Sequence, residues 1–332
     1  MPNTSVSVSL LCFFLLVTLL KPQKAMIAYP HLDSATLLWT HTSLAQVMPV
    51  VPLGPAPNTF DDAYLDCEEQ MEKEATHLLQ EEMAHHSLLR ESWGAATVAW
   101  ESRRRGLSLP VGFRTQHAVA IMVYTNSSNS LYQELNSAVR TAGSSREDYM
   151  KHFPFKALHF YLMQALQLLR ASKSCQEGLG QEVFRGVSTL RFQPQQLGDV
   201  IRLGQFASTS EEKGVAQGFG NATFFTVSTC FGVPIRAFSV FPEEREVLIP
   251  PHEIFLVSGF SQDGVRNLVT IRSLNQTCSH FNCAYLGREK KESCVSNPGQ
   301  SWEALFPGSW PQLMPRTLLL PHGAFQLSGP VP

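Results

Sequence analysis

The chain has 332 residues, a formal net charge of -2, 44% hydrophobic residues and 16% charged residues. This composition predicts a globular protein with a sizeable core and argues against a disordered chain. A nucleic-acid binder carries a basic stripe, and the one tight basic run here is Arg103-Arg104-Arg105. We therefore expect no nucleic-acid partner.

The N-terminal region contains an apolar run from Ser9 to Leu20. The run is short for a membrane span and is typical of a signal peptide. We interpret residues 1–45 as a signal or leader region and residues 46–59 as a Pro-rich lead-in. Residues 60–295 are expected to form the folded domain. Residues 296–332 repeat Pro without periodicity, which predicts a disordered tail.

The first half of the chain has mostly helical patterns. Residues 61–105 show apolar positions near a period of 3.6, which predicts helix. Residues 117–124 form a continuous apolar run that we interpret as a buried strand. Ser144 and Glu147 have capping-box spacing, and Pro154 interrupts or restarts the helix. The stripe that follows predicts core positions at Leu158, Leu162, Ala165 and Leu169.

Beyond Gln181, short runs rich in Val, Ile, Phe and Thr alternate with Gly and Pro. Helices first and strands later predict an α+β domain with largely antiparallel sheets. One helix is expected near residues 211–217. The predicted strands are residues 182–185, 204–209, 222–230, 234–240, 246–249, 254–257 and 268–271.

Seven cysteines are present, and Cys12 lies in the expected signal region. The other six are an even number, as oxidising compartments favour: Cys67, Cys175, Cys230, Cys278, Cys283 and Cys294. Their spacing matches no metal site, so none is predicted. Sequons at Asn126, Asn221 and Asn275 predict N-glycosylation and, with the cysteines, favour secretion.

The segment from Phe241 to Pro250 holds a Glu-x-Glu pair, Glu244 and Glu246, before an apolar strand-like run. In an extended chain, residues i and i+2 point to the same face. Two such carboxylates repel each other unless a cation sits between them. Carboxylate pairs are how proteins handle cationic sugar centres, although a charged strand end at a solvated turn would have the same sequence.

Three short segments stand in order on the strand-rich half: Val183-Phe-Arg-Gly186, Phe206-Ala-Ser-Thr-Ser210 and Glu244-Arg-Glu246. Each is common alone, since an Arg on a strand is usually a surface charge and Ser-Thr-Ser is usually turn chemistry. Together, with their spacing, they resemble the signature of the arginine-specific mono-ADP-ribosyltransferases. The likeness is to the ecto-ADP-ribosyltransferases, including a secreted vertebrate branch, and covers roughly residues 60–286.

The resemblance implies a fold and a co-substrate. The fold would be an N-terminal helical region packed on a mainly antiparallel two-sheet core, with residues 60–295 as the catalytic domain. The co-substrate would be NAD, or NADP, with no prosthetic group. Arg185 would engage the diphosphate, and Gly186 would offer backbone near the nicotinamide amide. Tyr124 would add a further contact with the dinucleotide.

The remaining site residues also take their expected roles from the resemblance. Glu246 would stabilise the oxocarbenium-like ribose, and Ser208 would orient Glu246 by a hydrogen bond. Glu244 would bind the guanidinium of the arginine acceptor. Arg245 should face the other way, at a position where the family varies.

The expected reaction is transfer of ADP-ribose from NAD to arginine residues of extracellular proteins. NAD glycohydrolysis, with water as acceptor, needs the same Arg and Glu and stays open as the alternative. A third reading is a secreted binding protein on an inactive scaffold, and the intact Arg185, Ser208, Glu244 and Glu246 weigh against it. No obligate oligomer is indicated.

The resemblance further implies disulfides Cys67–Cys283 and Cys175–Cys230, which leaves Cys278 with Cys294. Relatives that are GPI-anchored end in an apolar tail of about 10–20 residues. Here the segment from Leu313 to His322 is broken by Pro and Arg. We therefore expect secretion rather than membrane anchoring.

Overall fold

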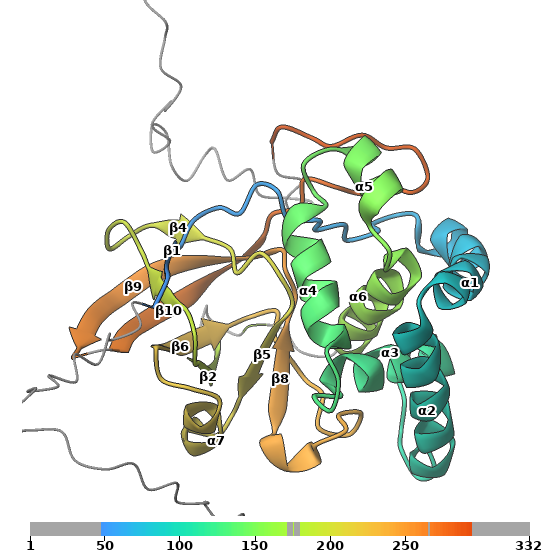
Figure 1. The fold of residues 1–332 in the computed structure, drawn as a ribbon, viewed down its shortest axis with the longest axis horizontal. Helices are drawn as coiled ribbons and strands as arrows, with labels where there is room; N and C mark the ends of the chain where they lie inside the picture. Colours follow the sequence, from blue (N-terminus) through green and yellow to red (C-terminus); the bar gives the residue numbers. More distant parts are fainter. Residues whose placement is uncertain (1–47, 171–174, 176–179, 265, 294–332) are drawn as a thin grey trace, which may run out of the picture. The chain divides into compact units, whose positions relative to one another are not determined.

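The computed structural model describes residues 48–170, 175, 180–264 and 266–293, which form a helical half followed by a strand-rich half (Figure 1). The expected α+β class is confirmed. The helices are α1 (Glu68–His85), α2 (Ser87–Arg103), α3 (Thr115–Thr125), α4 (Leu131–Thr141), α5 (Arg146–His152), α6 (Lys156–Arg170) and α7 (Lys213–Gly218). The strands are β1 (Val50–Pro52), β2 (Gln181–Val187), β3 (Arg191–Gln193), β4 (Val200–Ile201), β5 (Ala207–Ser210), β6 (Thr223–Thr229), β7 (Val233–Pro234), β8 (Glu246–Ile249), β9 (Glu253–Asp263) and β10 (Arg266–Thr277).

Helix α3 corrects the strand predicted at residues 117–124. All residues from His117 to Thr125 are buried, because α3 packs between α2 and α6 and also contacts α4. A continuous apolar run fits a fully buried helix as well as a buried strand, so periodicity cannot separate them. The surrounding helices decide the outcome here.

Two helices begin at polar groups that stabilise their first turns. Ser145, rather than the predicted Ser144, caps α5 by accepting a 3.1 Å hydrogen bond from the backbone N–H of Asp148. Ser144 instead donates to the Asp148 carboxylate at 2.5 Å. The first turn of α6 is stabilised by Glu82, whose carboxylate accepts a hydrogen bond from the N–H of Ala157 at 2.9 Å. Pro154 ends the preceding segment as expected.

The main sheet has the strand order β4-β9-β10-β6-β2-β5-β8-β7, and β1 pairs with β3 in a small second sheet. Among the described strands of the main sheet, every neighbouring pair is antiparallel except β6 with β10, which is parallel. The apolar run of β8 is explained by packing on both faces of this strand. Leu248 packs in the helical core, whereas Val247 and Ile249 pack in the core on the opposite face.

The strand predicted at residues 234–240 is wrong beyond Pro234. The chain turns there, with Phe238 N–H and Ser239 N–H both donating to the carbonyl of Ile235 at 2.8 Å. Ile235 and Phe238 are both buried in the helical core. A separation of three residues puts them on one side of a turn, whereas a strand would have pointed them to opposite faces.

The beginning and the end of the described chain are joined by buried polar contacts. Arg202 is 4% exposed and makes an ion pair with the fully buried Asp61. The guanidinium also donates to the carbonyls of Pro55 at 2.8 Å, Ala56 at 2.7 Å and Cys278 at 2.6 Å. The charge of Arg202 is thus compensated and most of its donors are used.

The same junction continues through two aspartates and a disulfide. Asp61 accepts from the N–H groups of His280 and Phe281, each at 2.9 Å. Asp62 accepts from those of Cys283 at 2.9 Å and Ala284 at 2.7 Å. Cys67 is bonded to Cys283, so covalent and polar links coincide.

The remaining sequence expectations divide by whether they fall in the described residues. The structure joins Cys175 to Cys230, the second pair that the resemblance implies. Cys278 is disulfide-bonded, but its predicted partner Cys294 lies outside the described residues. The leader at 1–45 and the tail at 296–332 also lie outside them, so the predicted domain limits stay predictions. Within the described ranges, no helix is long and apolar enough to cross a membrane.

Replacing Asp61 by Asn should lower the free energy of unfolding by about 3 kcal/mol, because it leaves Arg202 as an unpaired buried charge. Urea denaturation followed by circular dichroism measures this loss. The exposed Arg104–Glu101 pair provides the control, since Glu101→Gln should cost less than about 1 kcal/mol. Equal effects of the two substitutions would contradict a special role for the buried pair.

Candidate active site

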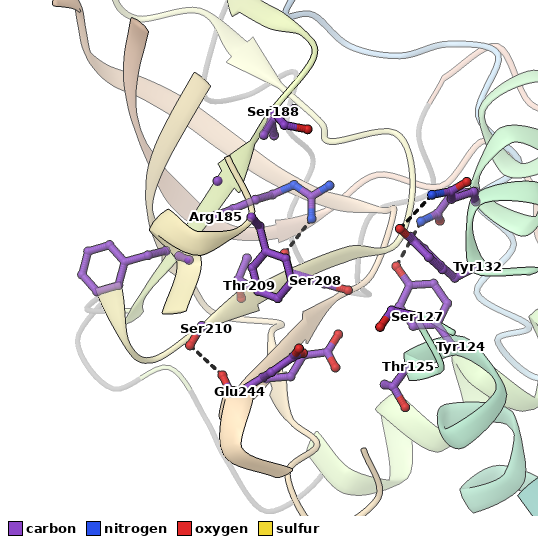
Figure 2. A pocket seen from close by; sticks show the side chains of 18 of the residues that line it. Tyr124, Thr125, Ser127, Tyr132, Arg185, Ser188, Ser208, Thr209, Ser210 and Glu244 are labelled. Atoms are coloured by element: carbon purple, nitrogen blue, oxygen red, sulfur yellow. Dashed lines mark hydrogen bonds between the residues drawn. The ribbon is translucent and has the colours of Figure 1, made fainter. Parts of the chain in front are cut away.

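A cavity of about 330 Å³ lies between the central strands and helices α3 and α4, with α7 at its rim. Figure 2 shows Arg185 and Ser208 reaching into it from the strands and Tyr124 and Tyr132 from the helices. Its lining includes every side chain or backbone position predicted for the site. These are Tyr124, Arg185, Gly186, Ser208, Glu244 and Glu246.

Three adjacent strands bring the sequence segments together. In the sheet, β5 lies between β2 and β8, so Phe184 is opposite Ser210 and Ser210 is opposite Glu246. Ser208 and Ser210 are two residues apart on β5 and therefore share a face. Arg185 extends across this strand, where its Nη1 donates to the carbonyl of Ser208 at 2.6 Å (Figure 2).

Glu246 is the most deeply buried carboxylate of the cavity, at 5% exposure. Burial, and to a smaller extent the neighbouring Glu244 charge, raises its pKa to about 7. Hydrogen bonds from Ser208 and Ser239 and the charge of Arg185 act in the opposite direction. A buried anion of this kind is stabilised when a cation enters the cavity.

Ser239 is a neighbour of Glu246 that the sequence did not indicate. It is fully buried, and its hydroxyl lies 3.5 Å from Oε2 of Glu246. The hydroxyl oxygen accepts the N–H of Phe241 at 3.1 Å, so its proton is available for the carboxylate. Ser239 was not predicted as a site residue because we expected a strand through it rather than a turn.

Glu244 enters the cavity by a different route from the one predicted. It ends a 3-10 turn, Pro242–Glu244, and Arg245 follows with a left-handed backbone at φ 47°. The two carboxylates are therefore not i and i+2 of one extended strand, yet both line the cavity. Partial burial and the charge of Glu243 raise the pKa of Glu244.

Ser210 fixes the turn that carries Glu244. Its hydroxyl donates to the carbonyl of Glu244 at 2.7 Å (Figure 2) and accepts from the N–H of Glu212 at 2.9 Å. Ser210 belonged to the Ser-x-Ser segment but received no predicted role. Its spacing from Ser208 was the available signal, since alternate strand residues face the same way.

The helical wall contributes polar groups around Tyr124. Its hydroxyl donates to the carbonyl of Phe206 at 3.1 Å and accepts from the amide of Asn136 at 3.0 Å. Burial raises the pKa of Tyr124 to about 12, so the phenol stays protonated at neutral pH. Tyr132, Gln133 and Asn136 of α4 also line the cavity. Nothing in their local sequence pointed to a site.

Gly186 has a structural reason to lack a side chain. A Cβ at this position would lie 2.1 Å from the carbonyl oxygen of Ala216 and 2.5 Å from that of Gly220. Both atoms belong to the backbone of α7 and the loop after it. Gly186 therefore allows α7 to lie against β2, which closes one side of the cavity.

The three sequon residues differ in position and exposure. Asn126 directly follows α3 and precedes the cavity residue Ser127, whereas Asn221 and Asn275 are exposed. Among the residues that the structure describes, no group of three or more His, Cys, Asp or Glu side chains could hold a metal ion.

Replacing Gly186 by Ala should lower the free energy of unfolding by about 2 kcal/mol or more, because the backbone of α7 must move away. Gly214 is the matched control, since a Cβ there meets nothing within 4 Å. Gly214→Ala in α7 should be neutral or stabilising by up to about 1 kcal/mol. Urea denaturation of both variants measures the contrast, and a neutral Gly186→Ala would refute the packing argument.

Comparison with known proteins agrees with this geometry. A family model described as NAD:arginine ADP-ribosyltransferase matches residues 53–279. Human ecto-ADP-ribosyltransferase 5 is 68% identical over 262 residues, covering 79% of this chain and 90% of that protein. Mouse GPI-linked NAD(P)(+)-arginine ADP-ribosyltransferase 1 is 43% identical over 259 residues, covering 74% of this chain and 76% of that protein.

The fold has a solved counterpart as well. A mutant of the eukaryotic mono-ADP-ribosyltransferase ART2.2, in complex with NADH, superimposes with a TM-score of 0.59 at 34% identity. The match covers 71% of this chain and 100% of the ART2.2 chain. Sequence, fold and cavity thus agree, and the chain belongs to the NAD:arginine ADP-ribosyltransferase family.

Proposed function

We propose that this chain transfers ADP-ribose from NAD to arginine side chains of extracellular proteins and releases nicotinamide. The observation that supports this most strongly is the single cavity lined by Arg185, Ser208, Glu244 and Glu246. It combines a guanidinium for a diphosphate with two carboxylates for two successive cations. Family membership supplies the reaction class.

Arg185 is proposed to bind the diphosphate of NAD. A guanidinium has five N–H donors, and the bond to the Ser208 carbonyl uses one of them while fixing the side chain. The bond therefore orients Arg185 without consuming its capacity for phosphate oxygens. Tyr124, Gly186 and Ser208 are proposed as further contacts with the dinucleotide, since they line the same cavity.

Glu246 is proposed to promote cleavage of the bond between nicotinamide and ribose. When that bond breaks, nicotinamide leaves with the electron pair and the ribose becomes an oxocarbenium-like cation. A carboxylate held in a buried site stabilises this cation more strongly than one in water. Ser208 and Ser239 would hold Glu246 in place through their hydroxyl groups.

Glu244 is proposed to prepare the arginine acceptor. An arginine side chain arrives protonated, because its pKa is above about 12, and is then a poor nucleophile. The Glu244 carboxylate would bind the guanidinium and accept one proton as the guanidinium nitrogen attacks the ribose carbon. The proton passes to solvent, so NAD and arginine give ADP-ribosylarginine, nicotinamide and one proton.

Hydrolysis remains the second candidate because water can take the place of arginine on the same cation. Glu244 favours transfer, since its carboxylate can attract and orient a guanidinium by charge-assisted hydrogen bonds, and a neutral water molecule lacks that charge attraction. Incubation of purified protein with labelled NAD and agmatine separates the reactions. Label on agmatine supports transfer, free ADP-ribose alone supports hydrolysis, and neither product supports a binding scaffold.

Secretion is part of the same proposal. The disulfides Cys67–Cys283 and Cys175–Cys230 fit an oxidising compartment. The sequon residues Asn221 and Asn275 are exposed, as glycan acceptors must be, and we propose glycosylation there and at Asn126. Release of the protein from transfected cells into the medium, without phospholipase treatment, tests secretion against a GPI anchor.

Replacing Glu244 by Gln should reduce transfer to agmatine by about 100-fold or more while leaving NAD cleavage within about tenfold, because only the acceptor step loses its carboxylate. Glu246→Gln is the contrasting variant and should suppress both reactions together. Product analysis with labelled NAD measures the two rates in each variant. Equal loss of both reactions in Glu244→Gln would contradict the division of roles.

The pH dependence should follow the ionisation of Glu246. Its pKa is about 7 in the unliganded protein, so kcat/KM for NAD should fall as pH decreases through about 7. Replacing Ser239 by Ala removes a hydrogen bond that lowers this pKa, so the fall in kcat/KM should begin at a higher pH. Ser239→Thr keeps the hydroxyl and should keep the profile. An unchanged profile in Ser239→Ala would remove Ser239 from the site.

A further inference from the structure

Arg245, between the two carboxylates, has an unusual backbone. Its φ of 47° and ψ of 48° place it in the left-handed region, where a residue with a Cβ loses about 1–2 kcal/mol. Arg245 is exposed and does not line the cavity. Polar contacts of Arg245 offset part of this strain.

Those contacts join the Glu244 turn to the segment between β5 and α7. Arg245 Nε lies 3.1 Å from Oε2 of Glu211, and Nη1 lies 2.5 Å from Oε1 of Glu212. The N–H of Glu211 donates to the carbonyl of Arg245 at 3.2 Å. With the Ser210 bond to the Glu244 carbonyl, they form a set that we call the clasp: Ser210, Glu211, Glu212 and Arg245.

The segment that precedes the Glu244 turn is bound to the helices. The N–H of Val240 donates to Oγ1 of Thr125 at 3.1 Å, and Nη1 of Arg103 donates to the carbonyl of Ser239. Glu244 thus sits between a fixed point on the helical half and the clasp on the strand half. Its carboxylate has no strand register of its own to hold it.

Glu246 is held differently. It begins β8 and is paired with Ser210 by sheet register, and its side chain is packed at 5% exposure. Loss of the clasp would therefore leave Glu246 in place and free only Glu244. It would also leave Glu211 and Glu212 without their cation, so they would compete with Glu244 for an incoming guanidinium.

We propose that Arg245 is a positioning residue that sets how often arginine, rather than water, captures the ADP-ribosyl group. Through the clasp it fixes Glu244 relative to Glu246 and keeps the carboxylates of Glu211 and Glu212 paired with a cation. This inference rests on the proposed transfer reaction. Arg245 itself touches neither substrate.

The test compares the ratio of ADP-ribosylagmatine to free ADP-ribose in several variants. Arg245→Asn removes the ion pairs but tolerates the left-handed backbone. Arg245→Lys retains one positive charge. The double variant Glu211→Gln with Glu212→Gln removes the pairs from the other side. Arg104→Asn disrupts the comparable exposed pair with Glu101 and is the matched control.

In Arg245→Asn, we expect the product ratio to fall by about three- to tenfold, while total NAD cleavage stays within about twofold. The double Gln variant should lower the ratio by less, because it removes both ion pairs of Arg245 but also removes the two competing carboxylates. Adding it to Arg245→Asn should bring the ratio to the same intermediate value, since both changes remove the same pairs. Arg245→Lys should be intermediate and Arg104→Asn unchanged. Because the clasp is exposed, high salt should lower the wild-type ratio by a larger factor than the ratio of Arg245→Asn, which has no ion pairs at this position left to screen.

Other outcomes separate the two proposals. If the wild-type protein transfers to agmatine but Arg245→Asn keeps its product ratio, the inference about Arg245 fails and the proposed function stands. A parallel loss of both products, with a lowered melting temperature, would reduce Arg245 to a purely structural role and would also refute the inference. Wild-type protein that makes only free ADP-ribose would overturn both proposals.

Discussion

Strand β5 is the constraint on which the site depends. Its four residues pair with β8 on one side, and Ser210 pairs with β2 on the other. This single position brings Arg185, Ser208 and Glu246 into one cavity, although they are far apart in the sequence. The strand also supplies both serines, one directed to the carboxylate in the cavity and one to the turn that carries Glu244.

Glu246, the carboxylate that we propose acts on the sugar, lies in an environment that disfavours its charge. Burial raises the pKa of Glu246 to about 7, so the unliganded protein holds part of its Glu246 protonated near neutral pH. A cationic nicotinamide or ribose favours the ionised form. The same burial that destabilises the free carboxylate would therefore strengthen the interaction that we propose with the reacting sugar, because little solvent screens it.

The structure brings the residues predicted for the site to one cavity, whereas the elements around that cavity were predicted less well. The segments carrying Arg185, Ser208 and Glu246 lie on strands that were predicted from local composition. Helix α3 was missed because burial on all sides removes helical periodicity. Ser239 and Asn136 were missed because their contacts with Glu246 and Tyr124 arise from tertiary packing, which leaves no local pattern. The turn that carries Glu244 ends at Arg245, whose backbone is left-handed, and no sequence pattern predicts that conformation for an arginine.

The buried contacts of Asp61, Asp62 and Cys67 with residues 278–284 have a consequence for how the protein is made. Asp61, Asp62 and Cys67, which precede α1, cannot make these contacts until nearly the whole described chain has been synthesised. Arg202 contacts both segments, so it has no complete set of acceptors before that point. Folding must therefore finish after residues 278–284 have been synthesised. The Cys67–Cys283 disulfide can form only once the two ends of the described chain lie together, and it then holds them covalently.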